Sequence, residues 1–280
     1  MRRVRWTCPS CATVVATAYC PTCGERRLGP RDLRLRTLLH QAFHELTSVD
    51  GRLVRSLREV TLHPGALTLA YLQGRRRPFL GPLQLFFLAN VVFFALQAVS
   101  GVRSFSTTLD SHLHHQDWSA VANVLVAQHL RASGQTIAEY APVFDRTIAL
   151  YAKSLIVLMV VPFALLVALL FGRRPLPTLV HATFALHTYV FLLMLLCVAS
   201  IAAGVDRLVG GPALQSPAFD HTLSAVALLA CAFYLHLAIA RVYPGKWTWT
   251  ALQALVLTLA LALIFMGYRF VLLPITLWMT

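Results

Sequence analysis

Residues 63–97 read HPGALTLAYLQGRRRPFLGPLQLFFLANVVFFALQ, and this stretch decides how the chain folds. Pro64 begins a short helix that Gly74 can end, three arginines follow at Arg75–Arg77, and the first long apolar run begins at Phe79. The chain before this stretch is basic and polar, whereas the chain after it is mostly apolar. The stretch therefore marks the boundary between a polar head and a membrane-embedded body.

The composition predicts a membrane protein. Apolar residues make up 58% of the 280 residues and charged residues only 12%, whereas soluble domains average about 25% charged residues. The charges are clustered, as expected where a charge at the bilayer centre is costly. The net charge of +13 also fits nucleic-acid binding, but basic cytoplasmic loops and anionic lipid headgroups explain it better. We therefore expect membrane lipids, and no nucleic acid, as partners.

Four cysteines near the N-terminus follow the spacing Cys-x2-Cys-x8-Cys-x2-Cys, at Cys8, Cys11, Cys20 and Cys23. Each Cys-x2-Cys turn presents two thiolates toward one point, and two such turns make the tetrahedral sulfur site that zinc prefers. A disulfide pair or a redox dithiol is the alternative, but a cytoplasmic location and the lack of a thioredoxin-like context disfavour both. Residues 1–28 are thus predicted to form a zinc-ribbon-like module with structural zinc, because four protein ligands leave no position for a catalytic water.

Residues 29–78 are predicted to form basic amphipathic helices, interrupted at Asp50-Gly51. They suit the headgroup region of the membrane, and equally the zinc module or the cytoplasmic ends of the membrane helices. His40 and His44 are spaced i, i+4 beside Glu45, which fits a metal pair on one helix face. We favour the simpler interpretation of two interfacial histidines.

Residues 79–280 are predicted to form an all-α, polytopic membrane domain. About five apolar runs are long enough to span roughly 30 Å of hydrocarbon at about 1.5 Å per residue. The predicted spans are 79–100, 150–171, 178–203, 221–241 and 248–273. Pro162 is expected to kink the second span.

The distribution of basic residues predicts the orientation. Eighteen Lys and Arg residues lie in the N-terminal region and in the short links 172–177 and 241–247, against six on the other side. The positive-inside rule then places the N-terminus in the cytoplasm and the C-terminus outside. Residues 101–149 become an extracytoplasmic loop, in which His112, His114 and His115 form a cluster near carboxylates. Such a cluster can bind Zn or Cu, but an exposed histidine-rich turn is the favoured interpretation.

Few polar side chains fall inside the predicted spans, and none of them is Asp or Glu. This absence disfavours a carboxylate-based proton pump or an intramembrane aspartyl protease, so we lean against an enzyme. The candidates for an intramembrane pocket are Asn90, His181, His187, Tyr189, Tyr234 and His236. The histidines suit a proton-responsive or metal-binding pocket in the inner half of the membrane. Interhelical hydrogen bonds that fix the packing are the favoured alternative.

The chain resembles the DUF3667 family of bacterial membrane proteins of unknown function. The resemblance rests on CPTCGE at residues 20–25, on the segment VRSLREVTLHPGALTLAYLQGRRRPFLGPLQLFFL at 54–88, and on FALHTYVFLL at 184–193. It implies a multi-span protein with a zinc-ribbon-like head, and it supplies no established activity and no accepted catalytic residues.

The leading functional hypothesis is an inner-membrane protein that serves in partner binding, assembly or regulation. Its zinc module would dock a cytoplasmic protein or brace the basic helices against the bundle, and the protein could form an oligomer. The alternative is a transporter or lipid-handling protein that uses the intramembrane histidines, with Arg75, Arg76 and Arg77 holding lipid phosphates.

Overall fold

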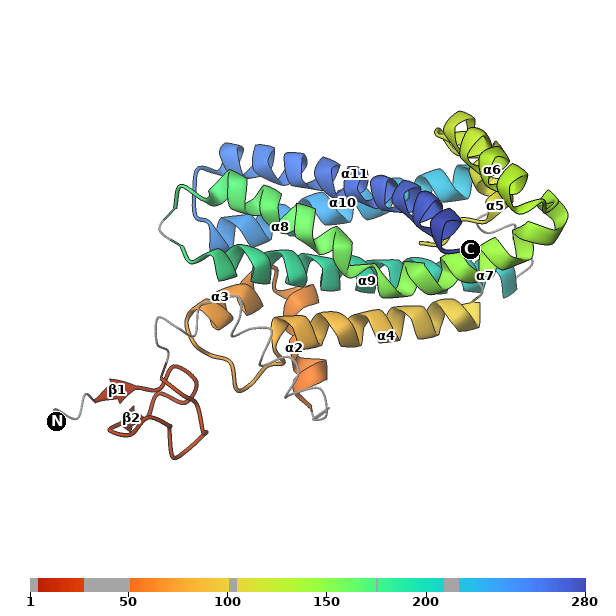
Figure 1. Ribbon diagram of the computed structural model, residues 1–280. Coiled ribbons are helices and arrows are strands. Elements are labelled where there is room, and N and C mark those ends of the chain that lie inside the picture. The colour runs from red at the N-terminus through yellow and green to blue at the C-terminus, as the bar shows by residue number, and fades with distance from the viewer. Residues whose placement is uncertain (1–4, 28–50, 101–104, 175, 209–216) are drawn as a thin grey trace.

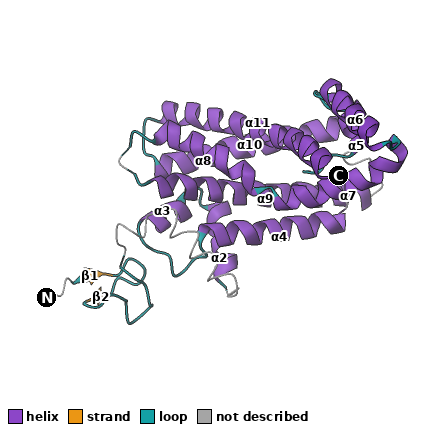
Figure 2. Cartoon of the chain, in the orientation of Figure 1, coloured by secondary structure: helices purple, strands orange, loops and turns teal. Residues whose placement is uncertain are grey.

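The computed structural model describes residues 5–27, 51–100, 105–174, 176–208 and 217–280 (Figure 1). Within these residues the chain forms ten helices and one two-stranded sheet, so almost all of the ribbon is helical (Figure 2). The predicted all-α architecture is confirmed. The first amphipathic helix expected from the sequence, with His40, His44 and Glu45, lies outside the described residues.

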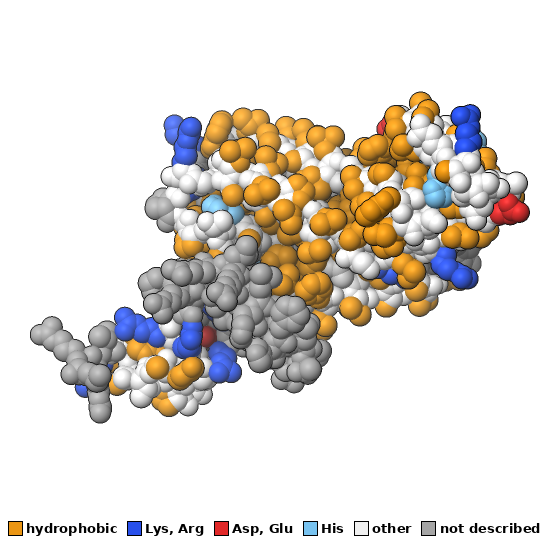
Figure 3. All heavy atoms as spheres, in the orientation of Figure 1, with side chains coloured by type: hydrophobic (Ala, Val, Ile, Leu, Met, Phe, Trp, Pro, Cys, Tyr) orange, Lys and Arg blue, Asp and Glu red, His pale blue; other side chains and the backbone are white. Residues whose placement is uncertain are grey.

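Five long helices run side by side and form the body of the molecule (Figure 1). They are α4 (Pro82–Ser100), α8 (Val157–Phe171), α9 (Thr178–Leu208), α10 (Pro217–Val242) and α11 (Trp247–Met279). The closest pairings join α4 to α9, α10 to α11, and α8 to α9. Large apolar side chains also cover the outside of the bundle, where Leu169 is 81% exposed and Leu229 is 70% exposed (Figure 3). A helix that is apolar all round suits lipid on its outer face.

Four helices are long and apolar enough to cross a membrane: α4, α9, α10 and α11. A fifth crossing results if α7 (Ile137–Ser154) and α8 together form one span, which bends by 44° between them. The bend lies at Leu155-Ile156, where the Leu158 and Met159 amides bond three residues back, to the Leu155 and Ile156 carbonyls. Pro162, where the sequence predicted a kink, lies six residues after Ile156, inside α8. The tight turn that precedes the proline therefore marks the break.

Residues 105–154 form a helical cap at one end of the bundle (Figure 1). The cap contains α5 (Leu109–His114), α6 (Ser119–Ser133) and α7. Arg269 of α11 donates from Nε to the Thr107 hydroxyl at 2.9 Å, and the Trp118 ring lies 5.7 Å from that of Phe270. These contacts fasten the cap to the last helix of the bundle.

The N-terminal elements gather at the opposite end (Figure 1). Strands β1 (Trp6–Thr7) and β2 (Val14–Val15) pair antiparallel, α2 (Arg52–Leu62) packs on α9 and α4, and α3 (Ala66–Leu72) contacts both α9 and α10. The links between α8 and α9 and between α10 and α11 lie at this same end. Residues 5–27 and the C-terminus thus lie at opposite ends of the bundle, as five crossings would place them.

Gly65 permits the close contact between α3 and α10. Its φ is +77°, and a Cβ at this position would lie 2.8 Å from the Ala238 carbonyl oxygen. Arg241 of α10 donates to the Pro64 carbonyl at 2.9 Å. The His63-Pro64-Gly65 turn therefore seats α3 directly against the backbone of α10.

Candidate metal centre and polar contacts of the bundle

The four N-terminal cysteines converge on one point. Their sulfur atoms all lie within 4.8 Å of one another, and no other such group of His, Cys, Asp and Glu occurs among the described residues. Cys8 and Cys23 are 3.5 Å apart at sulfur, and Cys11 and Cys20 are 3.4 Å apart. Four sulfurs on a tetrahedral zinc ion at about 2.3 Å would lie about 3.8 Å from one another. The cluster therefore fits a metal ion, and all four cysteines are free thiols.

Two similar turns present the cysteines. In the first turn, the Cys8 amide donates to the Thr13 carbonyl and the Ala12 amide donates to the Cys8 carbonyl. In the second, the Cys20 amide donates to the Glu25 carbonyl and the Gly24 amide to the Cys20 carbonyl. The residue after the second cysteine is left-handed in both turns, with φ of +58° at Ala12 and +71° at Gly24. We refer to residues 5–27, which contain both turns, as the four-cysteine module.

The cysteines of the cluster differ in acidity. The hydroxyl and backbone of Thr13 lower the pKa of Cys11 to about 6. At Cys23 the hydrogen bond with the Glu25 backbone is outweighed by burial and by the three neighbouring sulfurs, which raise its pKa to about 12. Metal ions bind the thiolate and not the thiol. A site with four protein sulfurs is closed to water, which is the arrangement of structural zinc sites.

Glu25 connects the four-cysteine module to the membrane body. One carboxylate oxygen of Glu25, Oε2, accepts from the Arg76 amide at 3.1 Å and from the Arg77 amide at 3.0 Å. The same oxygen accepts from the Ser10 hydroxyl at 2.7 Å, and the residue is only 4% exposed. The buried carboxylate is therefore satisfied by three donors, two of which belong to the arginine segment Arg75–Arg77.

The arginine segment makes further contacts with the module and with α3. Arg77 donates from Nε to the Gly24 carbonyl at 3.0 Å, and a Cβ on Gly24 would lie 2.9 Å from the Arg77 guanidinium. The Arg76 guanidinium lies over the Tyr71 ring, 4.3 Å from its centroid. The arginines predicted to contact lipid headgroups thus also form the seat of the four-cysteine module.

His187 of α9 meets α3 inside the bundle. Its Nδ1 lies 2.8 Å from the Thr68 hydroxyl, and both side chains are 2% exposed. Its Nε2 is buried and has no hydrogen-bond partner among the described residues. The histidine expected near the middle of the membrane is therefore bound to a helix of the N-terminal region.

The other residues predicted to line an intramembrane pocket each contact a different partner. Nδ1 of His181 lies 2.8 Å from the Tyr243 hydroxyl, whereas the half-buried His236 packs edge-on against Trp247 at 5.5 Å. The remaining three bond or stack locally: Tyr189 donates to the Met159 carbonyl, Asn90 donates to the Phe86 carbonyl, and Tyr234 stacks on Phe191 at 3.8 Å. A pocket shared by these residues stays a prediction.

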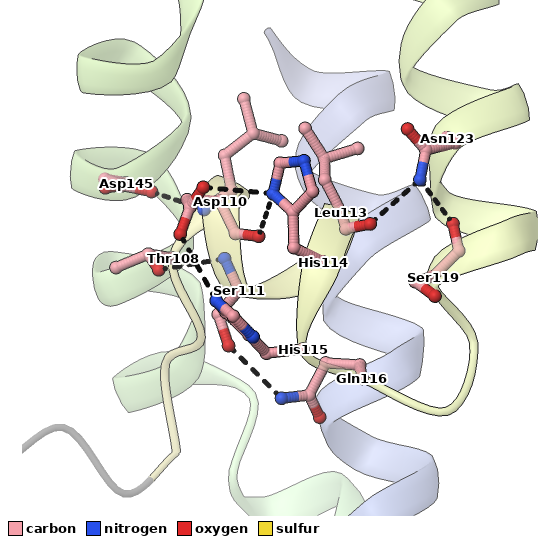
Figure 4. Close-up of polar contacts among 11 residues, drawn as sticks. Thr108, Asp110, Ser111, Leu113, His114, His115, Gln116, Ser119, Asn123 and Asp145 are labelled. Atoms are coloured by element: carbon pink, nitrogen blue, oxygen red, sulfur yellow. Dashed lines mark hydrogen bonds and ion pairs between the residues drawn. The ribbon is translucent and has the colours of Figure 1, made fainter. Parts of the chain in front are cut away.

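The three histidines of residues 105–116 make different contacts, and Figure 4 shows those of His114 and His115. Nδ1 of His114 lies 3.0 Å from Oδ1 of Asp110, and Nε2 of His115 lies 3.9 Å from Oδ2 of the same residue. His112 is fully buried and accepts from the Trp118 indole at 3.0 Å. His112 therefore has a packing role in the cap, away from the exposed Asp110 pair.

Sequence reasoning missed Glu25, Thr68 and Tyr243 as contact residues. Glu25 is the last residue of the second cysteine turn, and Thr68 is a polar residue within an apolar helical run, so both gave a weak signal. Their partners lie 51 and 119 positions further along the chain, which no local pattern reveals.

The fold and the cysteine cluster define a helical protein with four or five membrane-spanning candidates and a small module that could bind a metal ion. Residues 50–94 match the DUF3667 family, described as a protein of unknown function. The resemblance to that family is confirmed over this segment, which contains α2, α3, the arginine segment and most of α4. No curated protein and no solved structure matches the chain.

Proposed function

We propose that this chain is a protein of the bacterial inner membrane whose four-cysteine module holds structural zinc and serves in partner binding, assembly or regulation. The contact of Glu25 with the Arg76 and Arg77 amides carries this proposal. The backbone of Glu25 belongs to the second cysteine turn, while its side chain binds the segment that leads into α4. Metal binding by the module would thereby fix the geometry of the membrane entry.

A non-enzymatic role agrees with the chemistry of the four-cysteine module and with that of the predicted membrane spans. A closed sulfur shell gives no open coordination position for a substrate or a water. The predicted spans contain no carboxylate, which a carboxylate-based proton pump or an intramembrane aspartyl protease would need. The exposed face of the module is then the surface on which a cytoplasmic protein would dock.

The proposed orientation places the four-cysteine module in the cytoplasm. The module lies at the same end of the bundle as the links that carry Arg173, Arg174, Arg241 and Lys246 (Figure 1). Figure 3 shows Lys and Arg side chains around the module and at the ends of the bundle, with apolar side chains between. This arrangement supports a cytoplasmic module, because basic loops stay inside and a reducing compartment keeps thiols free for metal.

Metal analysis of the purified full-length protein tests the zinc assignment. We expect about one zinc per chain, since one tetrahedral site takes four sulfurs, and loss of that zinc in Cys20→Ser. Cys231→Ser is the matched control, because Cys231 is a buried thiol of α10 outside the cluster. Hydrogen exchange at the Arg76 and Arg77 amides should accelerate when a chelator removes the metal. A folded wild-type chain that contains no metal would contradict the proposal.

A second candidate is a transporter or lipid-handling protein. Buried polar atoms without partners favour it, namely His187 Nε2 on α9 and Asn90 Oδ1 on α4, for which no partner exists among the described residues. A bound water or ion is one arrangement that satisfies such buried atoms. Native mass spectrometry of the wild type should then show a retained small molecule that His187→Leu loses and Cys231→Ser keeps. A wild type free of bound molecules would rule out this candidate.

A further inference from the structure

The backbone of the arginine segment forms an anion site. The amides of Arg76 and Arg77 point at the same carboxylate oxygen of Glu25. Within the described part of the chain, the Arg77 amide has this contact alone, and the Arg76 amide also lies 3.0 Å from the Gly74 carbonyl. Successive backbone amides that converge in this way create a concavity that binds anionic oxygens.

The same segment carries three guanidinium groups, and that of Arg77 donates from Nε to the Gly24 carbonyl. Arg75 and Arg77 are exposed and Arg76 is half-buried over Tyr71. Amides supplemented by arginines are the chemistry of phosphate recognition, because guanidinium groups and backbone amides both form charge-assisted bonds with phosphate oxygens. The arginine segment therefore offers more hydrogen-bond donors and more positive charge than one carboxylate oxygen requires.

The location favours the phosphate of a lipid. The segment ends five residues before Pro82, the first residue of the membrane-spanning candidate α4. The start of a spanning helix lies at the level of the headgroups, and anionic lipids attract basic residues there. Ser10 and Glu25 are the module's contribution to the site, so displacement of the module would open it.

We propose that the Arg76 and Arg77 amides with their guanidinium groups form a phosphate site for an anionic phospholipid, which Glu25 of the four-cysteine module occupies as an internal competitor. The inference rests on the proposed function, because it assumes that the module is a docked, metal-bound head. A lipid phosphate would bind the two amides in place of the carboxylate, and Glu25 would return to water. The four-cysteine module would then be docked or released according to the local concentration of anionic lipid.

Hydrogen exchange of residues 75–80 in the full-length, zinc-loaded protein tests this proposal. In Glu25→Ala the Arg77 amide loses its acceptor, so its exchange should accelerate about tenfold or more. Adding phosphatidylglycerol to the detergent-solubilised variant should restore the protection, whereas phosphatidylcholine should not. Glu139→Ala is the matched control, since Glu139 also accepts a backbone amide, that of Thr136, but lies in the cap. This control should leave residues 75–80 unchanged.

Each contrary outcome has a defined meaning. Protection by inorganic phosphate alone overturns the lipid assignment, and the absence of protection by phosphatidylglycerol overturns the site. If Glu25→Ala loses its zinc, Glu25→Gln provides the same test, because its amide oxygen keeps the contact but binds more weakly. Zinc is measured in every sample. A wild type without zinc therefore refutes the proposed function, whereas a zinc-loaded variant that lipid cannot protect refutes the phosphate site.

Discussion

The hydroxyl of Thr68 lies 2.8 Å from Nδ1 of His187, although 119 positions separate the two residues. Thr68 belongs to a helix of seven residues, α3, and His187 to the long helix α9. Because His187 Nε2 has no partner within the described chain, this contact is the polar connection that holds the imidazole. The N-terminal region is therefore joined to the interior of the bundle by a specific buried pair.

Removal of the Thr68 hydroxyl should destabilise the protein. Thr68→Val keeps the shape of the side chain but leaves His187 without its hydrogen bond, at a cost of about 1–3 kcal/mol. Thr68→Ser retains the hydroxyl and should lose less stability. Denaturant unfolding of the detergent-solubilised protein gives the two values. A Thr68→Val protein that is as stable as the wild type, or more stable than Thr68→Ser, would show that the hydrogen bond does not contribute.

Gly65→Ala should be much more harmful than Gly134→Ala. Both glycines have positive φ, +77° and +69°, so both substitutions carry the same backbone strain of about 1 kcal/mol. A Cβ on Gly65 would clash with the Ala238 backbone, whereas nothing lies within 4 Å of one on Gly134. The difference between their melting temperatures therefore measures the contact of the His63-Pro64-Gly65 turn with α10. Equal melting temperatures would mean that this contact does not contribute to stability.

The two left-handed positions of the four-cysteine module should respond in opposite directions. Ala12→Gly relieves a positive φ and should stabilise the module by up to about 1 kcal/mol. Gly24→Ala adds strain and places a Cβ 2.9 Å from the Arg77 guanidinium. We expect weaker zinc retention against a competing chelator for Gly24→Ala and unchanged or stronger retention for Ala12→Gly. The opposite order would contradict the described backbone of the two turns.

Acid should destabilise the helical cap through His112. Burial, together with the charge of Arg269, lowers the pKa of His112 to about 4 from 6.5. Since the unfolded chain binds the proton more tightly, the free energy of unfolding falls as the pH drops from about 6.5 to about 4, by up to about 3 kcal/mol. His112→Gln can still accept from the Trp118 indole and does not titrate in this range. Its loss of stability over this pH interval should be smaller, and an identical loss would assign the effect to other groups.

The topology can be tested with fused reporters. A reporter that is active only outside the cytoplasm should be active after Thr280 and inactive after Gly245, in the link between α10 and α11. This result requires that α7 and α8 cross the membrane together, despite their 44° bend. An inactive reporter at Thr280 would indicate an even number of crossings.

The sequence predicted the features that depend on local patterns. The spacing of Cys8, Cys11, Cys20 and Cys23 was enough to predict that the four sulfurs cluster, because each pair lies in one short turn. Hydropathy was enough to predict α4, α9, α10 and α11 as candidate membrane spans, because each of them is one continuous, mostly apolar run.

The long-range contacts could not be predicted in this way. In the contact between Glu25 and Arg76, the donor is the backbone amide of Arg76. Because every residue except proline has such an amide, the sequence does not indicate which amide binds the carboxylate. Thr68 and His187 meet only because α3 packs against α9, and this depends on three-dimensional packing. The break at Leu155-Ile156 was also missed, since Pro162 was the more visible signal.

The position of α3 has a consequence for biosynthesis. The helix is complete at Leu72, but its partner α10 ends only at Val242, 170 residues later. At about 5–20 residues per second, translation takes roughly 10–35 seconds to cover this interval. During that time the apolar face of α3 has no site on α10. The seating of α3 against both helices is therefore a late step of assembly, and it marks chains whose α9 and α10 are already complete.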